Sequence, residues 1–378
     1  MQMLARKIAG LRSTSQSRQM AAVRMASTPT TTQQRILQLG RWLVLADYGE
    51  TARRNMIVAW ACVAALALVA LVWLPISALS FDPTTWPALA HSLIYAAIAY
   101  IFYLVVSHRL RQQQDRIAVF LRAALERFAL LFRSCVLIAA IGSVGLIFTY
   151  LATAAALPLK DGLLAVLDQR LGFHWLSFLS AANNHPLLAR LLTEAYESTA
   201  LLTQGVVVWL AIRRNGERLS EFLALLALSS VGLAIGMVLL PAAGANVYFA
   251  PTPQLFDNFA AGGKMWGFLD AFHGLRDGSL RTIDMSSVQG VVSFPSFHTM
   301  LGVITTYALR DTRAVFIPAI LLNGTMIVST LPVGGHYLVD VVAGAAVCIV
   351  GIQALRYASG HGRRARQSIT ALGLNEIS

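Results

Sequence analysis

The chain has 378 residues, of which 56% are hydrophobic and only 13% are charged, and its net charge is +12. A soluble globular domain carries about 25% charged residues, so the composition excludes that class and indicates an integral membrane protein. Excess positive charge in such proteins lies in cytoplasmic loops and tails. We therefore expect the bilayer, and not nucleic acid, to be its partner. The three cysteines lie in apolar runs without metal-ligand or redox spacing, which argues against a disulfide framework.

The N-terminal segment, residues 1–46, contains seven basic residues and no aspartate or glutamate. This composition predicts a disordered, basic cytoplasmic tail. A mitochondrial transit peptide has the same composition and remains an alternative. The whole chain contains few lysines beside many arginines, which is typical of a GC-rich genome and therefore favours a bacterial source.

Eight apolar runs that are long enough to cross a bilayer as helices then follow. They cover about 55–79, 88–107, 135–158, 188–212, 221–243, 292–309, 314–331 and 336–356. The stretch 111–133 is interrupted by five arginines and predicts an amphipathic helix on the membrane surface; residues 161–178 are also predicted to be interfacial.

The predicted fold class is therefore an all-α integral membrane protein with about eight transmembrane helices. Two spans and the surface helix occupy residues 47–134. A helical-bundle core fills residues 135–356, in the C-terminal two-thirds of the chain. A basic cytoplasmic tail, residues 357–378, ends it.

Basic residues fall in alternate connections between the predicted spans, which fixes the expected orientation. The connections that share the arginine-rich side with the N-terminal tail are 108–134, 213–220, 310–313 and 357–378. By the positive-inside rule, both termini are then cytoplasmic. In a bacterium the opposite side is the periplasmic face of the inner membrane.

Two stretches with unusual polar residues begin spans on this outer face. The first, SFPSFHT, contains Ser296 and His298, and the second, GGHYLVD, contains His336 and Asp340. An aspartate four residues after a histidine can accept a hydrogen bond from one ring nitrogen and leave the other as a nucleophile. His298 can serve as a general acid. The Ser296 hydroxyl and the free amides of a helix start favour an anion such as phosphate.

These residues carry a resemblance to a known family. FPSFHT and STLPVGGHYLVD resemble the second and third signature motifs of the type 2 phosphatidic acid phosphatase superfamily, and the phenylalanine form looks most like the branch that includes inositol phosphorylceramide synthases. The resemblance covers about 150–356. It implies that His336 attacks phosphorus and becomes a phosphohistidine, that Asp340 orients it, and that His298 protonates the leaving alkoxide.

The resemblance also implies that Ser296 and nearby amides, including that of Gly335, hold the phosphate oxygens. Two departures stand out: Thr330 occupies the position of the motif's arginine, and the first motif, KxxxxxxRP, is absent in that form. Phosphoryl transfer needs positive charge beside these oxygens. We expect another cation to supply it, with Arg276 as the first candidate and Lys264 as the second. No metal or other cofactor is implied.

The sequence thus predicts a membrane phosphoryl-transfer enzyme that acts on a phosphorylated lipid or polyprenyl phosphate, and a lipid phosphatase is the first choice. A lipid phosphotransferase that passes a phospho-head group to an alcohol is the alternative within this class. A non-catalytic membrane scaffold or a transporter is the alternative from another class. Glu194 and Glu197, in the fourth span, either pair with an arginine or line the substrate entry. The oligomeric state stays open.

Overall fold

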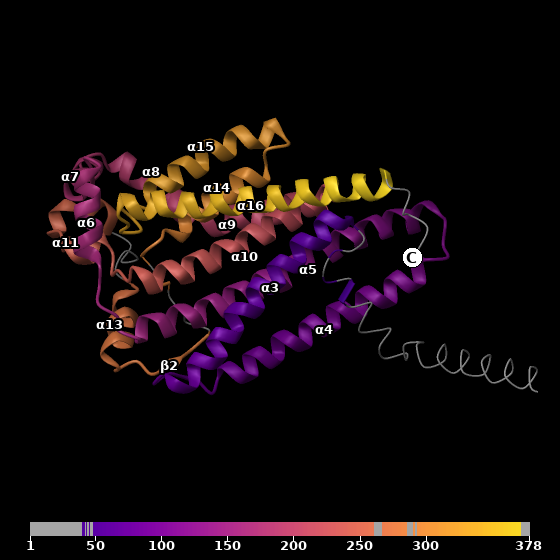
Figure 1. Ribbon diagram of the computed structural model, residues 1–378, viewed down its shortest axis with the longest axis horizontal. Helices are drawn as coiled ribbons and strands as arrows, with labels where there is room; N and C mark the ends of the chain where they lie inside the picture. The colour runs from indigo at the N-terminus through magenta and orange to yellow at the C-terminus, as the bar shows by residue number, and fades with distance from the viewer. Residues whose placement is uncertain are drawn as a thin grey trace, which may run out of the picture.

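The computed structural model describes residues 40–41, 43, 45, 48–260, 267–285, 290–291 and 293–371. Most of the predicted N-terminal tail, Lys264 and the last residues of the C-terminal tail lie outside these ranges. Within them the chain is almost entirely helical, and the helices form an elongated bundle (Figure 1). The predicted class, an all-α membrane protein with a helical core, is confirmed.

The elements of the described chain follow in this order: α3 Glu50–Trp73, η2 Leu74–Ile76, β1 Ser80–Phe81, α4 Thr85–Leu110, α5 Arg116–Ala154, α6 Asp161–Arg170, α7 Trp175–Asn183, α8 Pro186–Glu197, α9 Thr199–Ile212, α10 Gly216–Leu239, α11 Ala245–Phe249, η3 Pro253–Leu255, α12 Asp257–Ala260, α13 Leu269–Asp277, β2 Thr282–Ile283, α14 Phe297–Ala308, α15 Arg313–Ser329 and α16 Leu338–Ala371. The two strands are parallel and pair Ser80 with Thr282 and Phe81 with Ile283. They join the connection after α3 to the one after α13.

Five described helices are long and apolar enough to cross a membrane: α3 with η2, α4, α5, α10 and the first part of α16. A sixth span results if α8 and α9, which meet at a bend of 48°, are counted as one. The other two predicted spans form shorter helices, since α15 has 17 residues and α14 has 12. All eight apolar runs are therefore helical, but within the described residues at most six have the length of a full span. α16 also continues past its predicted end at 356.

The surface helix predicted at 111–133 is not a separate element, which corrects the prediction. From Arg116 onward it continues without a break into the third predicted span, and together they form the 39-residue helix α5. No glycine or proline occurs in this helix before Gly142, so nothing in the sequence ends it at the expected boundary. Two of its arginines donate to carbonyls at the ends of neighbouring helices: Nε of Arg127 to Ile212 at the end of α9, at 3.0 Å, and Arg122 to Leu110 at the end of α4, at 3.3 Å.

Helix α10 lies at the centre of the bundle and packs against α3, α5, α14 and α16. Its buried Phe222 shares one hydrophobic core with Ile304 of α14. A helix that is apolar on most of its circumference is stable only when it is surrounded by other helices or lipid. Near its end, Gly236 lets the chain before α14 approach closely, because a Cβ at this position would lie 2.3 Å from Cδ of Pro295.

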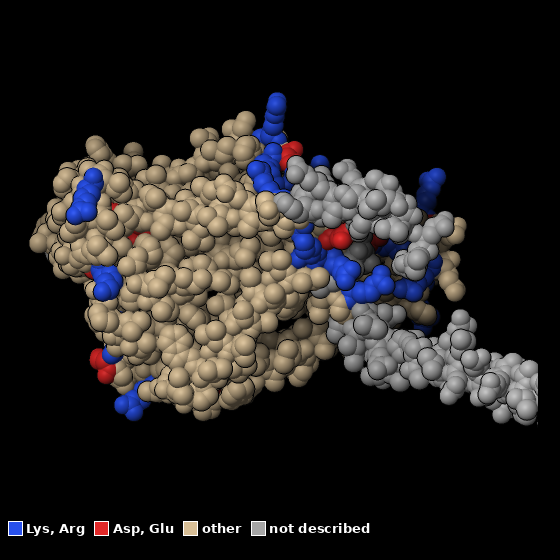
Figure 2. Space-filling model, in the orientation of Figure 1, with Lys and Arg blue, Asp and Glu red and all other residues tan. Residues whose placement is uncertain are grey.

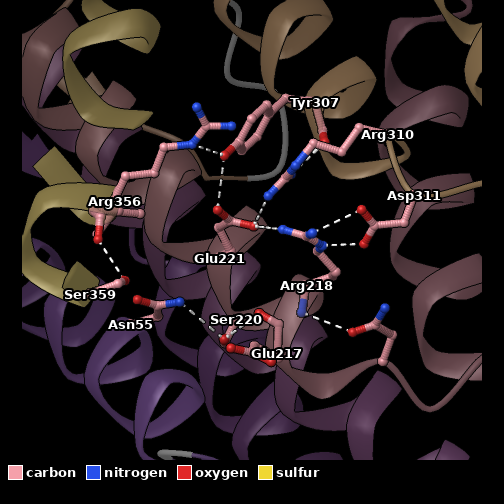
Figure 3. Close-up of polar contacts among 12 residues, drawn as sticks. Asn55, Glu217, Arg218, Ser220, Glu221, Tyr307, Arg310, Asp311, Arg356 and Ser359 are labelled. Atoms are coloured by element: carbon pink, nitrogen blue, oxygen red, sulfur yellow. Dashed lines mark hydrogen bonds and ion pairs between the residues drawn. The ribbon is translucent and has the colours of Figure 1, made fainter. Parts of the chain in front are cut away.

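The two ends of the bundle differ in charge. One end carries the short helices α6, α7, α11 and α13, and most of the lysine and arginine side chains visible in Figure 2 gather at the other. There Glu221 accepts hydrogen bonds from Arg218 at 2.8 Å and Arg310 at 2.7 Å (Figure 3). The Tyr307 hydroxyl donates to Glu221 and accepts from Arg356. These five residues, called the arginine cluster below, tie α10, α14 and α16 together.

Candidate active site

The two polar stretches meet at the end of the bundle opposite the arginine cluster. The amide of Ser296, just before α14, donates to the backbone carbonyl of Asp340 in α16 at 3.1 Å. The hydroxyl of Ser293 donates to Oδ2 of the same aspartate, also at 3.1 Å. Gly344 leaves room for this contact, since a Cβ there would lie 2.6 Å from the Ser296 carbonyl oxygen. The start of α14 is thus fixed on the first turns of α16.

His336 and Asp340 make the contact that their spacing predicts. Nδ1 of His336 lies 3.2 Å from Oδ2 of Asp340, and both side chains are buried. The same oxygen accepts a hydrogen bond from the Tyr337 amide at 2.9 Å. A carboxylate that accepts a hydrogen bond from Nδ1–H holds the proton of the neutral ring on Nδ1. Nε2 then carries no proton and is available as a nucleophile. The pair does not share a helical face, because His336 lies two residues before the start of α16.

Two glycines set the course of the chain into His336. Gly335 has φ +64°, and its carbonyl accepts from the first amide of α11 at 2.7 Å. A Cβ at this position would lie 2.3 Å from the side chain of Asn246, so conformation and space both require glycine. A Cβ on Gly334 would lie 3.0 Å from the rings of both His336 and Tyr196. The double glycine therefore lets the backbone turn tightly and lets two rings close around it.

His298 lies in the first turn of α14 and lines the same cavity as His336. Its ring stacks on that of Tyr196 in α8, with centroids 4.3 Å apart and an angle of 26° between the planes. The Tyr196 hydroxyl oxygen lies 3.4 Å from Nδ1 of His298. In both histidines Nδ1 therefore faces a protein group, and Nε2 is the nitrogen left for a substrate.

A cavity of about 820 Å³ contains both histidines. Its polar lining comes from α8 and the segment before α14, and includes Thr193, Tyr196, Glu197 and Ser293. Its apolar lining comes mainly from α5 and α10, and includes Ile141, Leu146, Phe148 and Leu233. Among the described residues, no lysine or arginine lines it. A cavity with polar groups at one part and an extended apolar wall suits an amphiphilic ligand.

Two buried carboxylates of α6 hold the segment that carries His336. Asp168 accepts hydrogen bonds from the first two amides of α16, each at 2.9 Å, and so caps that helix. Asp161 accepts from the Tyr337 hydroxyl at 3.0 Å and from two backbone amides that follow α10. Burial raises the pKa of Asp168, and the two α16 amides partly oppose this rise. Helix α6, predicted only as interfacial, therefore supports the site directly.

The structure places the four predicted phosphate ligands in different surroundings. Ser296 is fully buried, and its hydroxyl accepts from an amide of the first turn at 3.4 Å as the N-cap of α14. Gly335 forms the turn before His336. Arg276 donates to the carbonyl of Leu157 at 3.1 Å and is not among the residues that line the cavity. Lys264 lies outside the described residues.

Four residues of the site were not predicted: Ser293, Tyr196, Asp161 and Asp168. Ser293 belongs to the first polar stretch, so its side chain offered a usable signal. Tyr196 directly precedes Glu197, a candidate entry residue that does line the cavity. The two aspartates are seven residues apart, which places them on one face of a helix. Nothing in the sequence, however, indicates that this face meets the start of α16.

Comparison with known proteins agrees with this geometry. The model of the PAP2 superfamily matches residues 162–354, just over half of the chain. The matched part runs from α6 into α16 and contains His298, His336 and Asp340. No curated protein and no solved structure gives a significant match. The match is to the superfamily, so the synthase-like branch remains a prediction. The chain belongs to the PAP2 superfamily, the type 2 phosphatidic acid phosphatases and their relatives.

Proposed function

We propose that the protein is a membrane-bound lipid phosphatase that acts on a phosphorylated lipid or polyprenyl phosphate through a phosphohistidine. The observation that carries this proposal is the contact of His336 Nδ1 with Asp340 at 3.2 Å, on a cavity that His298 also lines. A nucleophile, an orienting carboxylate and a second proton-transfer group around one cavity are the parts that phosphoryl transfer without a metal needs.

In the first step, Nε2 of His336 attacks phosphorus as the bond from phosphorus to the lipid oxygen breaks. The imidazole becomes cationic because Nδ1 keeps its proton, and Asp340 stabilises that charge. Protonated His298 gives the proton on its Nε2 to the leaving alkoxide. The products are a free lipid alcohol and phosphohistidine at His336.

In the second step, water attacks the phosphohistidine. His298, now neutral, takes a proton from that water through Nε2 as the bond between phosphorus and nitrogen breaks. Phosphate leaves, and both histidines return to their starting states. An alcohol in place of water would give a phosphate monoester of that alcohol, so hydrolysis and transfer differ only in the acceptor.

The apolar lining from α5 and α10 supports a substrate with a hydrocarbon tail. The phosphate would reach the histidines while the tail remains among the helices. The phosphate charge still needs a cation. We keep Lys264 and Arg276 as candidates, with Ser296 and the amide of Gly335 as further ligands. Arg276 would first have to leave its hydrogen bond with the Leu157 carbonyl.

One observation favours the phosphotransferase alternative. Phe297, the residue by which the motif resembles the inositol phosphorylceramide synthase branch, lines the cavity next to His298. A bulky apolar side chain beside the proton donor would help to exclude water from the phosphohistidine. The acceptor would then be an alcohol head group.

The decisive experiment compares the purified wild type with His336→Ala on a panel of phosphorylated lipids. We expect the variant to lose at least about 1,000-fold in activity, since a nucleophile has no substitute. His185→Ala is the matched control, because His185 is an exposed histidine that does not line the cavity. Equal phosphate release by wild type and His336→Ala would contradict the enzymatic proposal and leave the scaffold or transporter alternative.

Trapping distinguishes the two enzymatic alternatives. Labelled phosphate from the substrate should appear on wild-type protein after acid-free quenching and be absent from His336→Ala. Adding inositol or glycerol should then leave the yield of inorganic phosphate unchanged for a phosphatase. For a transferase the label moves into a phosphate monoester of the added alcohol.

We propose that the site faces the periplasm of a bacterial inner membrane and that both termini are cytoplasmic. A cysteine at exposed Arg170, at the end of α6, tests this in a background where the native cysteines are serine. It should react with an impermeant thiol reagent added outside intact spheroplasts, whereas a cysteine at Arg109 should not. The reverse pattern would invert the orientation.

A further inference from the structure

Tyr196 is the aromatic residue of α8, and it lines the cavity between His298 and the turn that carries His336. Its ring covers that of His298 at 4.3 Å. Its edge lies beside Gly334, where a Cβ would meet both Tyr196 and His336 at 3.0 Å. A side chain in this place can control how the proton-transfer group is held.

The bend between α8 and α9 gives Tyr196 its position. The Ser198 hydroxyl donates to the carbonyl of Ala195 at 2.7 Å, and the Thr199 hydroxyl donates to that of Tyr196 at 2.6 Å. Hydroxyls that bond back to carbonyls in this way bend helices, and the two helices meet at 48°. The break is therefore built into the sequence EST, directly after the tyrosine.

We infer that Tyr196 is a positioning residue for His298. Its hydroxyl oxygen accepts a hydrogen bond from Nδ1–H of His298, and its ring stacks on the imidazolium, so that only Nε2 exchanges protons with the substrate. This inference rests on the proposed function. In both steps Nδ1 of His298 keeps its proton and its hydrogen bond to the Tyr196 hydroxyl. When His298 is protonated, its positive charge lies over the electron-rich face of the phenol ring, which favours that state.

The hydroxyl and the ring make separable contributions. Tyr196→Phe keeps the ring stacking and removes the hydroxyl that accepts the hydrogen bond from Nδ1–H of His298. Tyr196→Leu removes both. Because Tyr196 acts only through His298, its loss slows the first step in proportion to how much the leaving group needs a proton. A nitrophenolate leaving group needs none, whereas an alkoxide needs one.

The test measures the single-turnover rate of phosphohistidine formation, the first step, for the wild type and both variants on an alkyl phosphate lipid and on a nitrophenyl phosphate. We expect Tyr196→Phe to lose about 10-fold and Tyr196→Leu about 100-fold on the alkyl substrate, and both to stay within about 3-fold of wild type on the nitrophenyl substrate. Tyr248→Phe, which alters a half-exposed tyrosine, should change neither rate.

Two outcomes would overturn the inference: equal losses on both substrates, which indicate a structural role, or no loss on the alkyl substrate. His336→Ala, measured beside them, separates this from the proposed function, because it should abolish turnover of both substrates. If His336→Ala is inactive and Tyr196→Phe behaves as wild type, only the role of Tyr196 is wrong.

Discussion

The two ends of the bundle each hold a carboxylate in a network, but the partners differ in kind. Glu221 has both oxygens engaged, by two arginines and the Tyr307 hydroxyl. Asp340 accepts three hydrogen bonds on Oδ2, none of them from lysine or arginine, and its Oδ1 has no partner among the described residues. One charge is balanced permanently, whereas the other is balanced only when His336 becomes cationic.

This difference explains why one network ties helices together and the other can do chemistry. Arginine stays protonated under all ordinary conditions, so the arginine cluster has the same charge before and after any reaction. A histidine that bonds through Nε2 to phosphorus gains a positive charge next to Asp340. In the proposed mechanism, the buried carboxylate would thus stabilise the phosphohistidine more than the resting enzyme, which is the requirement for catalysis.

The largest effect should follow from Asp340→Ala, which removes the balancing charge and the acceptor for His336. We expect a loss of about 1,000-fold or more in kcat. Asp340→Asn should lose less, because an amide oxygen at the position of Oδ2 can accept the same three hydrogen bonds without the charge. Single-turnover rates of phosphohistidine formation test whether Asp340→Ala is slower than Asp340→Asn. Equal losses in both variants would assign the whole effect to the charge, whereas an unchanged rate in Asp340→Asn would assign it to the hydrogen bonds.

The next largest effect should follow from Gly334→Ala. The added methyl would lie 2.8 Å from the Thr330 carbonyl and 3.0 Å from the rings of His336 and Tyr196. Displacing reacting groups by a fraction of an ångström should cost about 10- to 100-fold in kcat. Gly324→Ala is the control, since nothing lies within 4 Å of its added methyl. Similar activities of the two variants would contradict the close packing.

The two candidate cations should differ in their effect on substrate binding. We expect Lys264→Ala to lower kcat/KM by about 10- to 100-fold, as loss of a phosphate-binding charge does. Arg276→Ala should lower it by less than about 3-fold, because that guanidinium is already bonded to the Leu157 carbonyl. Steady-state kinetics with a soluble substrate measures both. A larger loss in Arg276→Ala would show that Arg276 moves to the phosphate.

The smallest effect on activity, and a clear one on stability, should follow from Glu221→Gln. The glutamine leaves two arginines without their shared counter-charge in a site where Glu221 is only 15% exposed. We expect about 1–3 kcal/mol of destabilisation and kcat within about 2-fold of wild type. Thermal unfolding in detergent tests the predicted loss of stability, and an activity assay tests the predicted kcat. A large loss of kcat at unchanged stability would contradict the prediction and show that the arginine cluster influences the site at the other end of the bundle.

The contact between His336 and Asp340 and the class of fold could both be predicted from the sequence. His336 and Asp340 are four residues apart, so their contact depends on local geometry, and the apolar runs are long enough to be recognised as helices. Helix α5 was divided because arginines suggested a surface helix, although no residue there ends a helix.

The remaining parts of the site depend on contacts between distant segments. Tyr196 reaches His298 across 102 residues, and Asp168 reaches α16 across 170. A single sequence contains no signal for such pairs. Arg276 was a candidate ligand because of its charge and its predicted side of the membrane, but its partner is a backbone carbonyl in the connection between α5 and α6.

The hydrogen bonds that Asp161 and Asp168 of α6 accept at the start of α16 have a consequence for biogenesis. His336, just before α16, and Asp340, within it, are synthesised long after Asp161 and Asp168 of α6. If His336 is the nucleophile that we propose, it is held in place only after the last span has entered the membrane and packed against α6. A nascent chain that stalls earlier would then have no assembled active site, and activity would show that insertion is complete.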